Sequence, residues 1–368
     1  MVIETIRTQL HSSEWQREHE TAEVLVGAHL VISPAFMTPS NVTLTAAFVS
    51  NSLQTAMRHI YFFVRRKQIA ELVENIRSSP SKESVDVGAA ETAMRLTSAT
   101  QVHHYSAVIA LHHACAAAVS SVFIFILPTV LQSSENPPRR PLYSEMWFPY
   151  DLKDPLVHTY VLFWQALAVL LNVASAATTD AFTCSVMLVT AERSAMLARV
   201  APKALLPSQG NLTPHFRAWV KHHQHYLGLF SRINTLMGPI IFSVHLFGII
   251  NIIVFAYLIM KVDLFSMLVA LAHLASVLLQ VYTFANAGQR VIDNSEELGR
   301  NTLSAAQVAR GGLCEGHARS ALLVLVARCS GARPEELSGM GYFTVSVPLF
   351  SAVLGASVSF LLVLVQFK

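Results

Sequence analysis

The sequence predicts an all-α membrane protein, a polytopic bundle of seven transmembrane helices. Two observations predict this class: only 13% of the 368 residues are charged, and 53% are hydrophobic. A soluble globular protein carries about 25% charged residues, so this chain has too little charge to cover itself with a water-facing surface. The mean hydropathy of +0.45 agrees with a chain that lies largely in lipid.

Seven stretches approach the length of about 20 apolar residues that a helix needs to cross the hydrocarbon core. The first is short and contains His29 and Pro34, and the second carries Arg58. The remaining stretches are longer, and most of them are nearly free of charge. The predicted spans are 22–37, 42–64, 106–131, 156–189, 226–260, 264–288 and 341–368.

The orientation follows from the basic residues, because cytoplasmic loops carry an excess of Lys and Arg. With the amino terminus inside, 19 of the 26 Lys and Arg residues fall on cytosolic segments and five on outer ones. We therefore expect a cytosolic amino terminus and an extracellular carboxyl terminus. A G-protein-coupled receptor has the opposite orientation, and its motifs at the inner ends of the third and last spans are missing here, so that class is disfavoured.

Several other classes of function have no support in the sequence. No nucleotide-binding loop, nucleophile elbow or paired catalytic carboxylates appear, so we expect no enzymatic activity and no cofactor. His222 and His225 have helical spacing, but no Cys, Asp or Glu completes a metal set, so no metal site is predicted. The net charge of +3 is too small to indicate nucleic acid. Inverted-repeat transporters are disfavoured because no internal repeat is detectable.

Two charged residues fall inside predicted spans, where an unpaired charge is costly. Arg58 lies in the inner half of the second span and Asp180 in the inner half of the fourth. Two hypotheses remain open: Arg58 and Asp180 pair with each other, or Asp180 attracts cations. Pairing is the preferred interpretation.

Three segments are notable together: Gly341–Phe360, Trp147–Asp151 and Phe284–Ser295, with Arg328 and Pro334 between the last two spans. With these segments the chain resembles insect odorant receptors. The last span resembles the family's seventh helix, an aromatic-Pro-Tyr-Asp element precedes span four, and a polar stretch follows span six. The resemblance covers residues 42–368 and is most specific in the last 90 residues and around 145–165. Two features depart from the family: the usual Tyr and Trp after span six are replaced at 301–304, and the amino terminus is short.

The resemblance implies a tetrameric, non-selective cation channel that odorants open directly, with the last span of each subunit lining the pore. The chain would then divide into a six-span ligand-binding bundle (1–288), a cytosolic anchor segment (289–340) and the pore-lining span (341–368). The composition of the last span is compatible with this role, because it has no charge before Lys368 and carries several Ser residues and one Gln. By resemblance the gate consists of Val363, Gln366 and Phe367; the alternative is ordinary helix packing.

Odorants are small and apolar, so their pocket should be aromatic and offer few hydrogen bonds. In the family it lies in the outer half of the bundle, between spans two, three, four and six. The alternative for each candidate is a plain core residue, which is the commoner role of such side chains. The predicted pocket residues are Phe48, Phe123, Tyr160, Phe163, Trp164 and Met267.

The resemblance also implies partners: a small volatile odorant, olfactory co-receptor subunits and membrane lipid, in the plasma membrane of sensory neurons. The end of the chain, 363–368, is close to the co-receptor, but the loop between spans four and five is much shorter than the co-receptor's. We therefore predict a ligand-specific receptor subunit. The alternatives are the co-receptor itself, a gustatory-type receptor channel, a G-protein-coupled receptor and a transporter.

Overall fold

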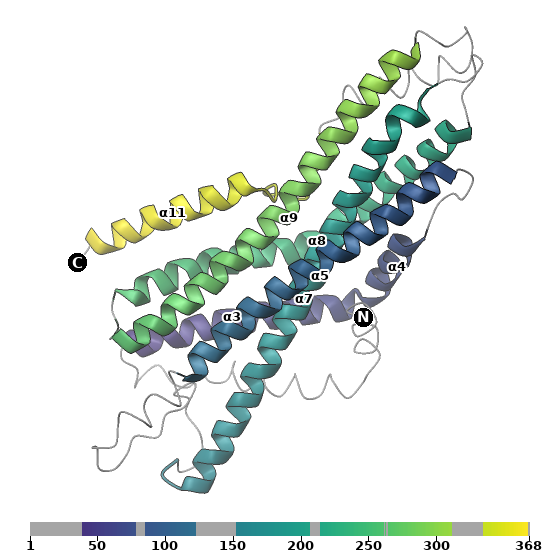
Figure 1. Ribbon diagram of the computed structural model, residues 1–368. Helices are drawn as coiled ribbons and strands as arrows, with labels where there is room; N and C mark the ends of the chain where they lie inside the picture. Colours follow the sequence, from purple (N-terminus) through teal and green to yellow (C-terminus); the bar gives the residue numbers. More distant parts are fainter. Residues whose placement is uncertain are drawn as a thin grey trace.

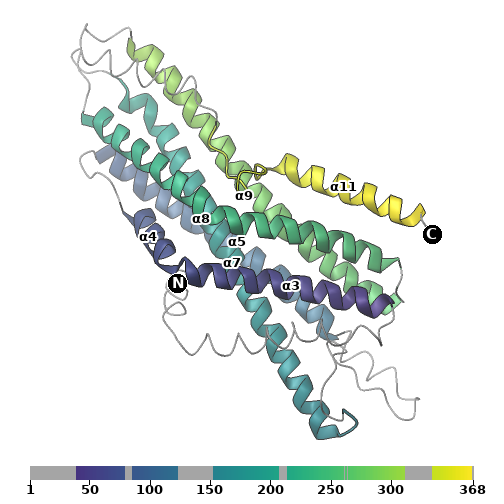
Figure 2. The same ribbon diagram turned by 180° about the vertical axis from the view of Figure 1, so that it is seen from behind.

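The computed structural model describes residues 39–78, 85–122, 152–206, 214–260, 262, 264–310 and 334–366, and within them it is an all-α bundle without a named strand (Figures 1 and 2). This confirms the predicted fold class. The first predicted span, 22–37, lies outside the described residues, and the other six coincide wholly or partly with helices. The helices are α3 (Pro39–Val64), α4 (Arg66–Arg77), α5 (Val85–Ser121), α7 (Pro155–Ala204), α8 (Pro214–Ile259), α9 (Leu264–Arg310) and α11 (Val347–Gln366).

Four helices are much longer than a membrane is thick. α5, α7, α8 and α9 have 37, 50, 46 and 47 residues. At 1.5 Å per residue they reach about 55–75 Å, roughly twice the hydrocarbon core of about 30 Å. One of them, α8, begins at Pro214 and continues without interruption through almost all of the predicted span 226–260.

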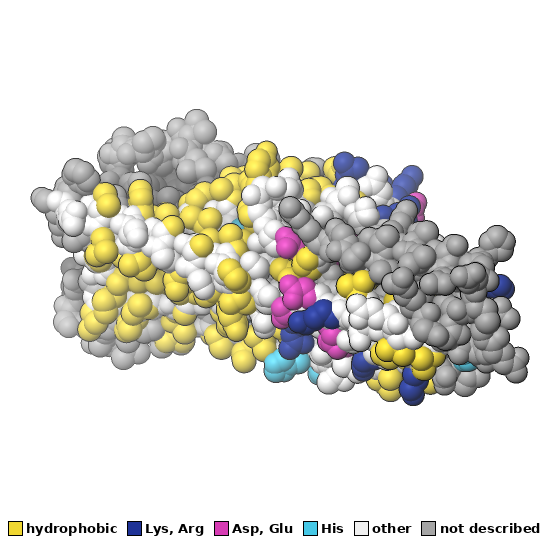
Figure 3. Space-filling model, turned by 90° about the horizontal axis from the view of Figure 1, so that it is seen from above, with side chains coloured by type: hydrophobic (Ala, Val, Ile, Leu, Met, Phe, Trp, Pro, Cys, Tyr) yellow, Lys and Arg dark blue, Asp and Glu magenta, His cyan; other side chains and the backbone are white. Residues whose placement is uncertain are grey.

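Length and composition mark three of the described helices as able to cross a membrane: Pro155–Ala204, His215–Ile259 and Met267–Ala309. Val347–Val363 of α11 is a shorter apolar helix. Figure 3 shows that hydrophobic side chains cover one half of the visible face, whereas Lys, Arg, Asp, Glu and His gather at the other. The bundle thus has an apolar zone and a charged zone along its long axis, as a protein that projects from a membrane requires.

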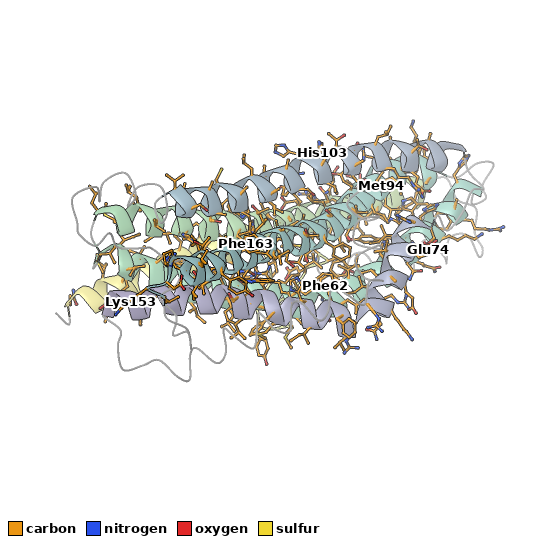
Figure 4. All side chains as sticks on the ribbon, turned by 90° about the horizontal axis from the view of Figure 1, so that it is seen from below. Phe62, Glu74, Met94, His103, Lys153 and Phe163 are labelled. Carbon is orange, nitrogen blue, oxygen red and sulfur yellow. The ribbon has the colours of Figure 1, made fainter. Side chains whose placement is uncertain are left out.

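Individual residues mark the two ends of the bundle's long axis. Lys153, just before α7, lies at one end of the molecule, and Glu74 of α4 and Met94 of α5 lie toward the other (Figure 4). Separate hydrophobic clusters lie along the bundle, because the long helices must bury apolar faces over their whole length. One contains Phe182 and Phe284 in the middle of the bundle. Another surrounds Trp219, Tyr226 and Met196 of α8 and α7.

A hairpin connects the bundle to α11, and we call residues 334–346 the strap. Ser338 and Thr344 form an isolated antiparallel bridge, and Leu337 and Val345 beside them are fully buried. The turn between them has positive φ at both central residues, 54° at Met340 and 81° at Gly341. That combination is typical of the two-residue turn that matches the twist of a hairpin. The strap therefore fixes the point from which α11 begins.

Candidate functional site

Four side chains from four helices form a polar layer inside the bundle: Arg58 of α3, His113 of α5, Asp180 of α7 and Gln280 of α9. Arg58 Nη1 donates to Asp180 Oδ1 at 2.5 Å, and Gln280 Nε2 donates to Asp180 Oδ2 at 2.6 Å. His113 Nε2 lies 3.6 Å from the same Oδ2. The predicted pairing of Arg58 with Asp180 is thereby confirmed.

Burial explains why these groups are paired. The side chains of Arg58 and Asp180 are each only 1% exposed. An ion taken out of water without a partner costs several kcal/mol, so each charge here requires the other. Since Arg58 neutralises Asp180 and both carboxylate oxygens have donors, the geometry favours pairing over the alternative that Asp180 attracts cations.

Further polar contacts connect α3 to α8 and α5 to α9. Asn251 Nδ2 of α8 donates to Asn51 Oδ1 of α3 at 2.8 Å. Asn286 Nδ2 of α9 donates to the Tyr105 hydroxyl of α5, also at 2.8 Å. In an apolar surrounding such side-chain hydrogen bonds fix the rotation of one helix against its neighbour.

The last helix has a different environment from the others. α11 leaves the bundle at an angle and, among the described helices, packs mainly against α8 and α9 (Figures 1 and 2). Phe350 and Val353 pack against a cluster that includes Ile252 and Val281, and Ser357 is buried. Most other described side chains of α11 are exposed, although its 20 residues include no charge. A helix of 20 residues is about 30 Å long, which matches the hydrocarbon core.

The predicted gate residues lie at the far end of α11. The Val363 side chain is 45% exposed, and Gln366, the last helical residue, is also exposed. Phe367 lies outside the described residues. Ser351 and Ser359 on the exposed surface of α11 donate their hydroxyl protons to the backbone carbonyls four residues earlier. Their oxygen atoms therefore remain available as acceptors. The gate assignment stays a prediction.

The predicted pocket residues are only partly described. Tyr160, Phe163 and Trp164 lie on the amino-terminal part of α7, which extends beyond the other helices in Figure 1, and they are 61%, 61% and 51% exposed. Trp164 makes edge-to-face contacts with both, at centroid distances of 6.1 Å and 6.0 Å. Met267 of α9 is half-buried. Phe123 and the side chain of Phe48 lie outside the described part.

These three aromatic rings thus form one exposed cluster, and the described residues do not enclose it. The pocket remains a prediction. The sequence reasoning missed His113 and Gln280, although each is a polar residue within an apolar stretch, the signal that had singled out Arg58 and Asp180.

The charged zone holds the end of α4 in place with three side chains. Arg193 donates to the carbonyl oxygen of Ile76 at 2.9 Å, Arg95 to that of Arg77 at 2.9 Å, and His225 Nε2 bonds that of Asn75 at 3.2 Å. The last carbonyls of a helix carry partial negative charge, so basic groups are favourable there. Burial, and next the charge of Arg193, lowers the pKa of His225 below its ordinary value. His225 is thus neutral in the folded protein at neutral pH.

The chain is similar to several known proteins. The sequence model of the 7tm Odorant receptor family matches residues 38–358. An odorant receptor coreceptor of Anopheles gambiae is 32% identical over 152 residues, which are 41% of this chain and 30% of that protein. The coreceptor of Drosophila melanogaster is 29% identical over the same shares. The matched region thus spans less than a third of the length of these curated relatives.

Two solved structures share the fold. The insect olfactory receptor OR5 from Machilis hrabei superposes with a TM-score of 0.75 at 14% identity, covering 95% of this chain and 87% of that one. The same receptor in complex with eugenol gives 0.77 at 13% identity, covering 97% and 91%. The match of the family model along most of the chain, together with this shared fold, shows that the chain is a multi-pass membrane protein that belongs to the 7tm odorant receptor family.

Proposed function

We propose that this chain is an odorant-specific subunit of a non-selective cation channel that it forms with the olfactory co-receptor in the plasma membrane of sensory neurons. The observation that carries the proposal, beyond family membership, is the environment of α11. An uncharged helix of membrane length leaves the bundle and exposes most of its surface. Copies of α11 from neighbouring subunits would cover part of that surface and line a central path.

The gate belongs to the extracellular end of α11 in this proposal. Val363 and Phe367 are four residues apart and share one face of the helix, with Gln366 beside them. A ring of apolar side chains from several subunits closes a narrow pore by excluding water, and moving the rings apart wets it again. The hydroxyl oxygens of Ser351 and Ser359 supply acceptors for hydrated cations farther along the helix.

The ligand site belongs to the outer part of the bundle, with the aromatic cluster of α7 as one wall. Tyr160, Phe163 and Trp164 offer large apolar faces, and Phe48, Phe123 and Met267 are the candidates from the other helices. A small volatile molecule would bind by burial of apolar surface and dispersion. Its preference for the open arrangement would shift the population of channels toward that state. The eugenol complex of the related receptor supports a small aromatic molecule as a ligand of this class.

Other parts of the chain have supporting roles. We assign ligand binding to residues 1–288, subunit anchoring to 289–340 and the pore to 341–368, with the amino terminus cytosolic and the carboxyl terminus outside. The chain has no enzymatic role in this proposal. The clustering of basic side chains at the end of α4 agrees with a cytosolic position for the charged zone.

The matched relatives are co-receptors, so the chain could act as the co-receptor itself. Expression in a cell line without other odorant receptors separates the two functions. A ligand-specific subunit gives odorant-evoked cation currents only together with a co-receptor, whereas a co-receptor also supports currents with an unrelated odorant receptor. The test uses eugenol and a panel of volatile alcohols, esters and aldehydes. Surface expression without current in any combination would refute the channel function.

A further inference from the structure

The two carboxylate oxygens of Asp180 connect α7 to two other helices, α3 and α9. Asp180 Oδ1 accepts from Arg58 of α3, and Asp180 Oδ2 accepts from Gln280 of α9, at 2.5 Å and 2.6 Å. The Asp180 side chain is almost completely excluded from solvent, so neither donor can exchange its partner for water. A displacement of α3 or α7 therefore reaches α9 through this residue.

α9, the helix that contains Gln280, also contacts the start of α11. Gly288 lies eight residues farther along α9, about 12 Å along the helix axis, and it packs directly against the strap at Val345. Gln289 Oε1 accepts a hydrogen bond from the backbone N–H of Val347, the first residue of α11, at 3.3 Å. Tyr282 meets Phe350 edge to face, with a centroid distance of 5.5 Å. α9 thus determines where α11 starts.

We propose that Asp180 is a positioning residue for gating, which transmits movement of α3 and α7 through Gln280 and α9 to α11. The proposal rests on the proposed channel function. It adds a route between the ligand-binding part of the bundle and the pore helix, made of a polar layer with directional hydrogen bonds.

Stability alone does not explain the layer. A well-packed apolar pair of similar volume is often as stable as a buried ion pair, or more stable. What the ion pair and the amide add is direction, because each hydrogen bond holds its helix in one rotation relative to α7. A positioning role and a structural role therefore make different predictions for an apolar replacement of the layer.

The test uses two variants of the full chain, expressed with a co-receptor. Gln280→Met keeps the side-chain volume and the Arg58–Asp180 pair, and it removes only the connection to α9. Arg58→Met/Asp180→Leu removes both charges together, so neither charge is left buried alone. The matched control is Glu91→Gln, because Glu91 also pairs with an arginine, Arg95, at 2.8 Å, but within one helix. Surface amount and concentration–response curves are measured with the first odorant of the panel that opens the wild-type channel.

Both layer variants should reach the surface in amounts comparable to the wild type. The odorant concentration for half-maximal current should rise about tenfold in each, a factor within the usual range for coupling between contacting groups. Glu91→Gln should leave this concentration unchanged. Unaltered concentration–response curves in both layer variants would overturn the proposal. So would a lower surface amount with an unchanged half-maximal concentration, since a structural residue acts in that way.

A second measurement does not depend on current. Ser359 is exposed on α11, so the thiol introduced by Ser359→Cys reports on the surroundings of that helix. Its rate of labelling by a water-soluble thiol reagent should differ between the chain with Ser359→Cys alone and the chain that also carries Gln280→Met. The labelling of native cysteines, measured in the matching chain without Ser359→Cys, is subtracted from each. An equal rate in the two chains would refute the coupling. If the wild-type channel gives no current, the proposed function fails, and the labelling rate still decides whether the layer positions α11.

Discussion

Gly288 offers a sharp test of how the strap is held against α9. A Cβ at this position would lie 2.3 Å from the carbonyl oxygen and 2.8 Å from Cγ1 of Val345. At these distances the added carbon would overlap both atoms of Val345. The carbonyl oxygen belongs to the backbone, so it cannot rotate away as a side chain can. Gly288→Ala must therefore push the strap off α9. Because Val345 is fully buried, the strap cannot move without opening the core around it.

The magnitude follows from two opposing effects. Overpacking of a tight contact costs about 1–3 kcal/mol. Replacing a glycine by alanine inside a helix stabilises it by about 1 kcal/mol, since alanine has the higher helix propensity. Gly299 on the same helix provides the matched control, because nothing lies within 4 Å of its Cβ position. Gly299→Ala should therefore show the propensity gain alone, and the two variants should differ by about 1–3 kcal/mol.

The assay is thermal unfolding of the purified chain in detergent or nanodiscs, followed by intrinsic fluorescence. Gly299→Ala should melt at or above the wild-type temperature and Gly288→Ala below that of Gly299→Ala. Channels that contain Gly288→Ala should also show altered current without ligand, because the base of α11 has moved. Equal melting temperatures for the two variants would refute the tight contact between the strap and α9.

Three further predictions concern the gate, the pocket and the charged zone. Phe367→Ala should raise the cation leak without odorant, measured as holding current, because a smaller side chain weakens the apolar ring; an unchanged leak would assign Phe367 to packing. Trp164→Ala should raise the half-maximal odorant concentration by roughly tenfold to a hundredfold, given about 1.5–3 kcal/mol for a buried aromatic side chain, with unchanged leak; an unshifted curve would exclude Trp164 from the pocket. Burial lowers the pKa of His225, so the unfolded chain takes up a proton there more readily than the folded chain. The free energy of unfolding should therefore be highest above the ordinary pKa of 6.5 and should decrease as the pH falls through and below that value. His225→Gln should flatten the decline of the melting temperature between pH 7.5 and 5.5, and an identical decline in both chains would contradict this reasoning.

The sequence predicted those parts of the fold that depend on one chain and its solvent. Charge density and the length of the apolar stretches predicted the helices, because both reflect the cost of placing polar groups in lipid. The same cost predicted that Arg58 and Asp180 would meet. It did not predict Gln280 as the second partner, because uncharged amides are tolerated in apolar stretches for many reasons and spacing alone does not show which helix a side chain faces.

The conformation of the strap could not be predicted from the sequence for a different reason. Its turn places Met340 at positive φ, where a non-glycine residue is uncommon, so no local preference of methionine indicates it. The strap is instead held by its neighbours: Gly238 of α8 lies against Ser338 and Met340, and Gly288 of α9 lies against the buried Val345. Such a segment takes its conformation from its neighbours and not from its own residues.

The candidate gate and pocket are still harder to predict from the sequence, because the described part of one chain does not supply all of the side chains around them. On α11, apolar side chains such as Val358 and Leu362 are about half exposed, yet the helix carries no charge that would favour water around it. Lipid can cover these side chains as well as another protein can, so hydrophobicity alone does not choose between the two. The serines provide a test, because a hydroxyl oxygen that faces lipid gains no further partner, whereas one that faces a water-filled axis meets donors or cations. Substituting Ser351 and Ser359 together by Ala should therefore lower single-channel conductance if they face the pore, and leave conductance unchanged if α11 turns that side to lipid.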